Sequence, residues 1–191
     1  MSNKLLGILA LIGAPWLFIG TPMERRMPHL SDSWFTGVWG IIFISGWMCA
    51  VIALKRLRAT GNTSFGKILL IVLLISLSIA NLSNVIQIFV ERNKPSYFVF
   101  FDLFWPLSNI IMFIVGVMVI IAKRLRGWKL YIPLATGLWF PLAMLSSLID
   151  NRIVSLFFGG FYSVIAWALL AIVIILTKKG TEAVMTKYQT Y

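Results

Sequence analysis

The chain has 191 residues, of which 60% are hydrophobic and only 12% are charged. This apolar share exceeds that of ordinary soluble domains, so the composition excludes a soluble globular protein. The formal net charge of +11 would suggest nucleic-acid binding in a soluble protein, but here the basic residues form short clusters beside apolar segments. We therefore expect the basic residues to contact membrane lipids, and we expect no nucleic-acid partner.

Six apolar segments follow one another along the chain, most of them close to the roughly 20 residues that a membrane-spanning helix needs. The first segment is short and contains Pro15, which predicts a kink or an early end. The fifth contains Pro133 in its first turn, where proline costs little, and Pro141 in its interior. We predict an all-α, polytopic membrane protein with six transmembrane helices in three hairpins, forming a single integral membrane domain over residues 1–191. The predicted helices cover residues 5–20, 35–54, 68–90, 97–122, 130–148 and 153–177.

The charged residues divide unequally when alternate loops are assigned to alternate sides of the membrane. One side receives twelve basic residues and one acid, a net charge of +11, and the other receives five of each, a net charge of zero. Since basic loops stay in the cytoplasm, we expect a multi-pass protein of the inner (plasma) membrane with both termini cytoplasmic. No small-residue cleavage site follows the first segment, so we expect a retained span rather than a signal peptide. The twelve basic residues are Lys4, Lys55, Arg56, Arg58, Lys67, Lys123, Arg124, Arg126, Lys129, Lys178, Lys179 and Lys187.

Polar side chains inside the predicted spans gather mainly in the halves that lie away from the basic loops. In segment 68–90 and just after it, they fall within roughly a 100° arc of one helix face. Polar groups inside a bilayer are costly, which makes such clustering informative. We predict an outward-facing polar pocket for a small polar or zwitterionic molecule or a lipid headgroup, with a minimal transporter as one variant. The predicted ligand-binding residues are Asp102, Glu91, Gln87, Asn84 and Asn109, with Asp150 and Arg152 at the rim.

Asp102 is the best single candidate for an ionisable group that anchors the ligand. Aromatic residues flank it, including Phe101 and Trp105, and a charged carboxylate in such a setting is costly if it is buried. A carboxyl group of this kind suits ligand binding or proton coupling. The alternative is that Asp102 caps the following helix, because Asp is favoured at helix N-termini.

Two further functions fit the same polar residues. Asn, Gln and Ser side chains often form hydrogen bonds between membrane helices, so the polar face could hold the bundle together. The protein would then be a structural or accessory subunit that acts through helix–helix contacts, with a homo-oligomer or another membrane protein as its partner. A third function is a carboxylate-dependent enzyme acting on lipid headgroups, whose turnover would depend on Glu91 or Asp102. The halves of the spans near the basic loops lack an evident polar path, which favours one-sided binding over transport.

The remaining residue types argue against a catalytic or cofactor site. Cys49 is the single cysteine and His29 the single histidine, which excludes an intrachain disulfide, a Cys-rich metal site and bis-His haem. The sequence contains no Gly-x-Ser-x-Gly, His-Glu-x-x-His or P-loop motif. We therefore expect no metal and no cofactor, and an enzyme is the less favoured interpretation.

Overall fold

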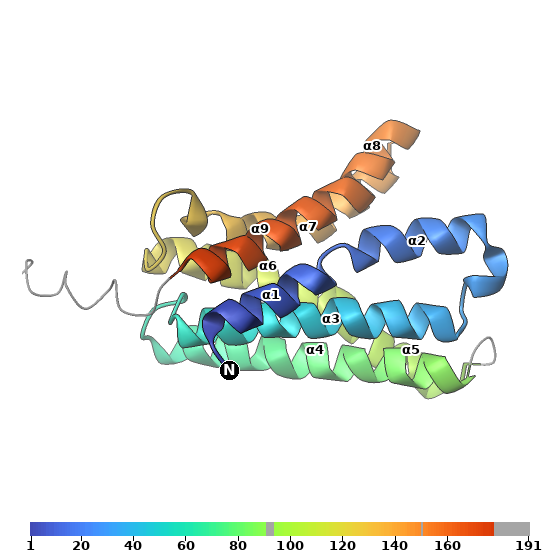
Figure 1. Cartoon of the computed structure of the whole chain (residues 1–191), viewed down its shortest axis with the longest axis horizontal. Helices are drawn as coiled ribbons and strands as arrows, with labels where there is room; N and C mark the ends of the chain where they lie inside the picture. Colours follow the sequence, from blue (N-terminus) through green and yellow to red (C-terminus); the bar gives the residue numbers. More distant parts are fainter. Residues whose placement is uncertain (91–93, 150, 178–191) are drawn as a thin grey trace, which may run out of the picture.

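The computed structural model describes residues 1–90, 94–149 and 151–177, and every regular element within them is helical (Figure 1). Five segments are long and apolar enough to cross a membrane, and Ile132–Ser147 is a shorter apolar helix. The prediction of an all-α, membrane-embedded protein is confirmed at this level. The five long segments are Asn3–Arg26, Trp34–Arg56, Ser64–Val90, Ser96–Ala122 and Phe157–Leu176.

The first long segment consists of two helices, α1 (Asn3–Gly13) and α2 (Trp16–Arg26). They are separated at Pro15, as the sequence led us to expect. The predicted end near Gly20 is wrong, because α2 continues through Pro22 to Arg26. Apolar character ends near Gly20, but the helix continues, and Glu24 in its polar extension accepts hydrogen bonds from Thr36 and Trp39 of the following helix.

The rest of the chain forms helices whose bounds lie close to the predicted ones. The fourth predicted segment is interrupted at Leu103, between α5 and α6. The sixth predicted segment contains a π-helical turn. Two short 3-10 helices, η1 and η2, lie in connecting segments. The elements are α3 (Trp34–Arg56), α4 (Ser64–Val90), α5 (Ser96–Asp102), α6 (Phe104–Ala122), α7 (Ile132–Ser147), α8 (Arg152–Leu156), the π-turn η3 (Phe157–Phe161), α9 (Tyr162–Leu176), η1 (Pro28–Leu30) and η2 (Gly127–Leu130).

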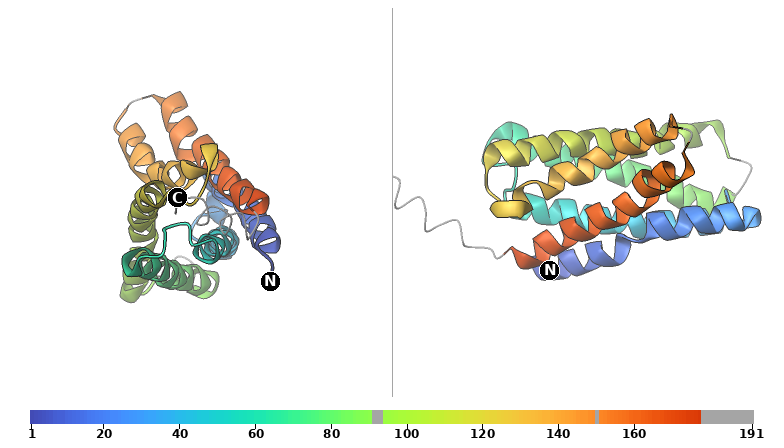
Figure 2. Two further views of the ribbon diagram at one scale, coloured as in Figure 1. Left: turned by 90° about the vertical axis from the view of Figure 1, so that its left-hand side faces the viewer. Right: turned by 90° about the horizontal axis from the view of Figure 1, so that it is seen from above.

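The helices form a closed bundle, in which successive long helices pack against each other and α9 returns to α1 (Figure 2). The crossing of α1 and α3 is especially close at Gly13 and Gly46. A Cβ atom added to Gly13 would lie 2.9 Å from the Cα of Gly46. Small residues at such crossings let membrane helices approach closely.

Aromatic rings fill the middle of the bundle. Trp167 packs edge-on against Trp47 and Trp139, with ring centroids 5.3 and 5.5 Å apart, and Trp139 packs against Trp105 at 5.7 Å. These rings come from α3, α6, α7 and α9, so their contacts connect four helices across the interior of the bundle.

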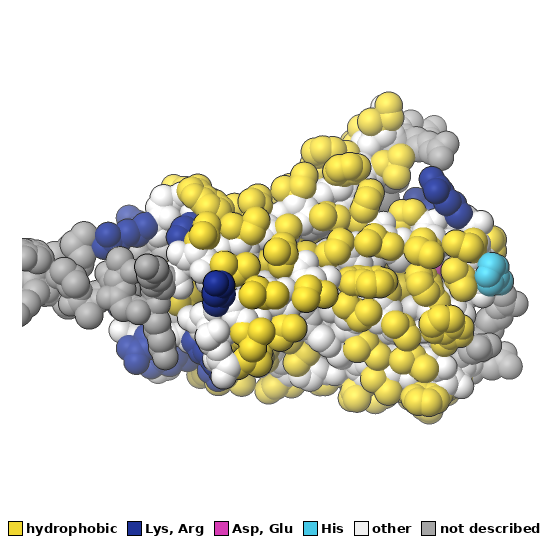
Figure 3. All heavy atoms as spheres, in the orientation of Figure 1, with side chains coloured by type: hydrophobic (Ala, Val, Ile, Leu, Met, Phe, Trp, Pro, Cys, Tyr) yellow, Lys and Arg dark blue, Asp and Glu magenta, His cyan; other side chains and the backbone are white. Residues whose placement is uncertain are grey.

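The outer surface of the bundle is also apolar. Figure 3 shows hydrophobic side chains over the middle of one face, with Lys and Arg gathered mainly at one end. Large aliphatic side chains such as Ile12, Ile75 and Ile110 are more than half exposed, as expected for helices that face lipid rather than water. We call the end with the N-terminus and residues 57–63 and 123–131 the basic end, and the other end the opposite end.

Candidate functional site

A cavity of about 330 Å³ lies toward the opposite end, between α2, α3, α4, α5 and the start of α6. Its volume is at the lower end of the range for small-molecule sites. Charged, amide and hydroxyl side chains line it together with aromatic rings. The lining residues are Leu17, Thr21, Asp32, Thr36, Trp39, Gly40, Phe43, Ile44, Ala80, Ser83, Asn84, Gln87, Lys94, Phe98, Asp102 and Trp105.

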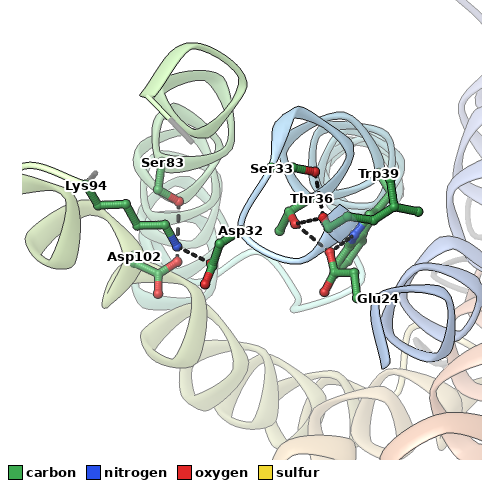
Figure 4. A network of polar contacts seen from close by, with 9 residues as sticks. Glu24, Asp32, Ser33, Thr36, Trp39, Ser83, Lys94 and Asp102 are labelled. Atoms are coloured by element: carbon green, nitrogen blue, oxygen red, sulfur yellow. Dashed lines mark hydrogen bonds and ion pairs between the residues drawn. The ribbon is translucent and has the colours of Figure 1, made fainter. Parts of the chain in front are cut away.

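An ion pair joins the two connecting segments at this cavity. Lys94, just before α5, donates to Asp32, just before α3, with Nζ and Oδ1 2.5 Å apart (Figure 4). The same ammonium group lies 4.5 Å from the ring centroid of Phe98, whose side chain is buried. Asp32 has a φ of 53°, in the left-handed region, where Asp is more readily accommodated than most residues. A carboxylate and an aromatic face therefore surround one ammonium group.

A second polar group fixes α2 to α3 beside the cavity. The carboxylate of Glu24 accepts hydrogen bonds from the Thr36 hydroxyl, at 2.5 Å, and from the Trp39 indole, at 2.8 Å (Figure 4). The Trp39 ring also lies against Gly20, where an added Cβ would be only 2.5 Å from the ring. Gly20 and Glu24 are one helical turn apart, so α2 holds the ring at two points.

Asp102 lies at the C-terminal end of α5 and is exposed. Ser83 of α4 donates to it over a long distance, 3.5 Å between Oγ and Oδ1. The burial that would make its charge costly is therefore absent. Asp102 also does not cap α6, because Leu103 occupies the capping position and makes no side-chain bond there.

Gln87 is the most deeply buried amide at the cavity. Its side chain is only 3% exposed, and its Nε2 atom has no hydrogen-bond partner among the described residues. A buried donor left without a partner costs about 1–3 kcal/mol. One turn earlier on α4, Asn84 donates to Asn81 at 3.3 Å and packs against Gly40 of α3.

The cavity brings together Asp102, Gln87 and Asn84 of the predicted ligand-binding residues. Asn109 is buried on α6, where its Nδ2 donates to the Trp105 carbonyl at 2.9 Å, and it does not line this cavity. Glu91, Asp150 and the side chain of Arg152 lie outside the described residues.

Several cavity residues were not predicted as ligand-binding from the sequence, notably Asp32, Lys94, Thr36 and Trp39. Asp32 and Lys94 belong to different connecting segments, and no sequence pattern indicates that they meet. Thr36 and Trp39 are three residues apart at the start of α3, a spacing that places both on one face. In the sequence, this shared face with a polar residue is the feature that could have indicated that Trp39 faces other helices rather than lipid.

Other polar residues serve helix packing. Ser76 of α4 and Ser108 of α6 form a buried hydrogen bond with their hydroxyl oxygens 2.8 Å apart. Asn81 of α4 donates to Ser45 of α3 at 3.3 Å. These polar residues therefore form interhelical contacts, as one interpretation of the sequence expected. The polar residues that line the cavity are different ones.

A smaller cavity of about 210 Å³ lies on the other side of α2, between α2, α7 and η3. Leu17 and Thr21 line both cavities, so α2 separates the two. Its hydroxyl groups at Thr21 and Ser146 donate to carbonyls within their own helices.

Among the described residues, no group of three or more His, Cys, Asp or Glu side chains is placed to hold a metal ion. The ionisable groups that line the cavity between α3, α4 and α5 are Asp32, Lys94 and Asp102. Comparisons of the chain with protein-family models, with curated proteins and with solved structures find no match.

Proposed function

We propose that this protein binds a small polar molecule or a lipid headgroup in the cavity of about 330 Å³ that Gln87 lines. The observation that carries the proposal is the Nε2 atom of Gln87, which is buried at the cavity and has no hydrogen-bond partner in the part of the chain that the structure describes. Buried polar groups in folded proteins are nearly always paired. A ligand that offers an acceptor to Gln87 would supply the missing bond.

The lining of the cavity supports a polar ligand of limited size. Its volume of about 330 Å³ is close to the lower limit of the sites that hold small organic ligands. Asp102 and Asp32 offer carboxylates, Lys94 offers an ammonium group, and Trp39 and Trp105 offer apolar ring surface. A few polar groups among aromatic walls are typical of sites that orient small ligands.

One-sided binding suits the bundle better than transport. The rings of Trp47, Trp139 and Trp167 fill the middle of the bundle on the basic side of the cavity. A polar substrate passing through would have to displace these packed rings. In the membrane orientation that the basic end favours, with both termini cytoplasmic in an inner (plasma) membrane, the cavity faces outward.

A structural or accessory subunit is the second candidate, because some polar side chains inside the bundle, such as Ser76 and Ser108, join helices and do not line the cavity. In that case the polar residues of α4 serve assembly, and a partner membrane protein or a second copy should co-purify. Substitution of Gln87 would then reduce assembly with the partner, and the wild-type chain would carry no bound ligand.

Native mass spectrometry of the gently solubilised protein tests the proposal. We expect a bound mass on the wild-type chain that is lost in Gln87→Met and reduced in Asp102→Asn. Asn109→Ala is the matched control, because Asn109 is a buried amide that does not line the cavity. A bare wild-type chain, or a bound mass that all three variants retain, would contradict the proposal.

A further inference from the structure

We propose that the cavity selects an ammonium group, and that the Lys94 side chain occupies the place of this group when no ligand is bound. The inference rests on the proposed function, because it specifies the chemistry of the ligand that the cavity binds. The ligand would be a small organic amine or the ammonium headgroup of a lipid.

The contacts of Lys94 define the subsite. Its Nζ atom is 2.5 Å from Asp32 Oδ1 and 4.5 Å from the ring centroid of Phe98. A carboxylate and an aromatic face are groups with which proteins bind organic ammonium ions. The subsite therefore already holds an ammonium group, one that belongs to the chain itself.

The charges at the cavity favour a cationic ligand once the Lys94 side chain moves away. Among the described residues that line it, Asp32 and Asp102 are acidic and Lys94 alone is basic. When Lys94 moves away, an ammonium group of the ligand would take its place beside the Asp32 carboxylate and keep the net charge of the cavity unchanged. Charge complementarity would then favour a cation over an anion of similar size.

Lys94 is well placed to move. Its side chain is 26% exposed, and its ammonium is carried on a flexible stem of four carbons. Phe98 is held in α5 and Asp32 in the segment before α3, so the subsite would persist after the ammonium leaves. The apolar part of the ligand would lie against Trp39 and Trp105, with Gln87 donating to an acceptor on it.

Calorimetric titration of the full chain in neutral detergent tests this inference. The probes are n-butylammonium chloride and sodium butyrate, which have similar size and opposite charge. We expect Lys94→Gln to bind butylammonium about three- to fivefold more tightly than the wild type, because a tethered competitor in a part-exposed ion pair has been removed. Asp32→Asn should weaken butylammonium binding, and Asn keeps the left-handed backbone accessible at this position.

Lys129→Gln is the matched control. It removes the same charge at the basic end, where Lys129 donates to the Leu176 carbonyl, and should leave butylammonium affinity unchanged. An equal gain in both lysine variants would mean that net charge alone is responsible, which would overturn the role of Lys94.

Three other results would also overturn the inference. Butylammonium affinity that is unchanged or lower in Lys94→Gln would mean that Lys94 does not compete with the ligand. Butyrate binding that Lys94→Gln abolishes would make the cavity an anion site, and the proposed ligand-binding function would stand without amine selectivity. If neither butylammonium nor butyrate binds to the wild type or to Lys94→Gln, this subsite is excluded, while the bound mass in native spectra would still decide the proposed function.

The source of the ammonium group can be read from the same samples. If butylammonium displaces a bound phosphatidylethanolamine from the wild-type chain in native spectra, the group comes from a lipid headgroup. If it binds without displacing lipid, and a small amine is the native bound mass, the ligand is soluble. Both results support selection of an ammonium group.

Discussion

Trp39 donates its indole N–H to the carboxylate of Glu24, with Nε1 and Oε1 2.8 Å apart. This bond connects α3 to the polar end of α2, beyond the point where the apolar part of the first segment stops. It also fixes one aromatic wall of the cavity. Helix α2 is separated from α1 at Pro15, so this contact is one of the few that set its position.

Breaking this contact should destabilise the bundle. A hydrogen bond to a charged group contributes about 1.5–3 kcal/mol, so we expect Glu24→Ala and Trp39→Phe each to lower the free energy of unfolding by about that amount. The double variant should cost less than the sum of the two, because both remove the same bond. Equilibrium unfolding in mixed micelles measures all three. Strict additivity would show that the two side chains do not interact.

Replacing Gln87 should weaken ligand binding without lowering the stability of the ligand-free protein. Gln87→Met keeps the approximate volume and removes a buried donor that no described residue pairs with, so we expect the apo protein to gain about 1 kcal/mol or remain unchanged. The same change should weaken ligand binding. Thermal unfolding and ligand content are measured on the same preparations. A variant that is clearly less stable without ligand would show that the amide already has a partner.

The close crossing of α1 and α3 predicts a sharp difference between two glycines. A Cβ at position 13 would lie 2.9 Å from backbone atoms of α3, whereas a Cβ at position 159 would meet nothing within 4 Å. We expect Gly13→Ala to lower the free energy of unfolding by about 1–3 kcal/mol through overpacking. Gly159→Ala is the matched control and should be tolerated. Equal melting temperatures for the two variants would contradict this packing.

The Ser76–Ser108 bond should contribute to the stability of the bundle and not to ligand binding. Hydrogen bonds between membrane helices contribute about 0.6 kcal/mol on average, so Ser76→Ala should cost roughly that amount. Ligand content should stay at the wild-type level, since Ser76 does not line the cavity. A loss of bound ligand without a change in stability would mean that the polar cavity extends further toward the basic end.

The charge distribution predicts which end faces outward. In a Cys49→Ala background, we expect His29→Cys to react with a membrane-impermeant maleimide in intact cells, and Asn62→Cys to react only after the cells are opened. Both positions are exposed and lie at opposite ends of the bundle. The reverse pattern would place the basic end outside and contradict the orientation proposed for the cavity.

The sequence predicted the class of fold because apolar length and the helical spacing of polar residues are local properties. Segments 35–54 and 97–122 match α3 and the α5–α6 pair within one or two residues at each end. The extension of α2 to Arg26 could not be predicted from hydropathy, because Glu24 is stabilised by Thr36 and Trp39 of another helix. Helix ends that depend on tertiary partners leave no local signal.

Only part of the candidate site could be predicted, because some of its residues share a local pattern and others meet only through tertiary structure. Gln87 and Asn84 lie on a polar face that is visible in the sequence, and that face borders the cavity. The pairing of Lys94 with Asp32 spans 62 residues and depends on how the ends of the helices meet. Asn109 was predicted to bind the ligand but does not line the cavity, because it lies buried on α6 and its Nδ2 donates to the Trp105 carbonyl of the same helix.

Cryo-electron microscopy of the protein extracted with its native lipids, at a resolution that shows bound small molecules, tests the central claim most directly. We predict density in the cavity between α3, α4 and α5, with a polar atom within hydrogen-bonding distance of Gln87 Nε2. A cavity closed by side chains that pair with Gln87, or one filled only by a lipid acyl chain, would contradict the account.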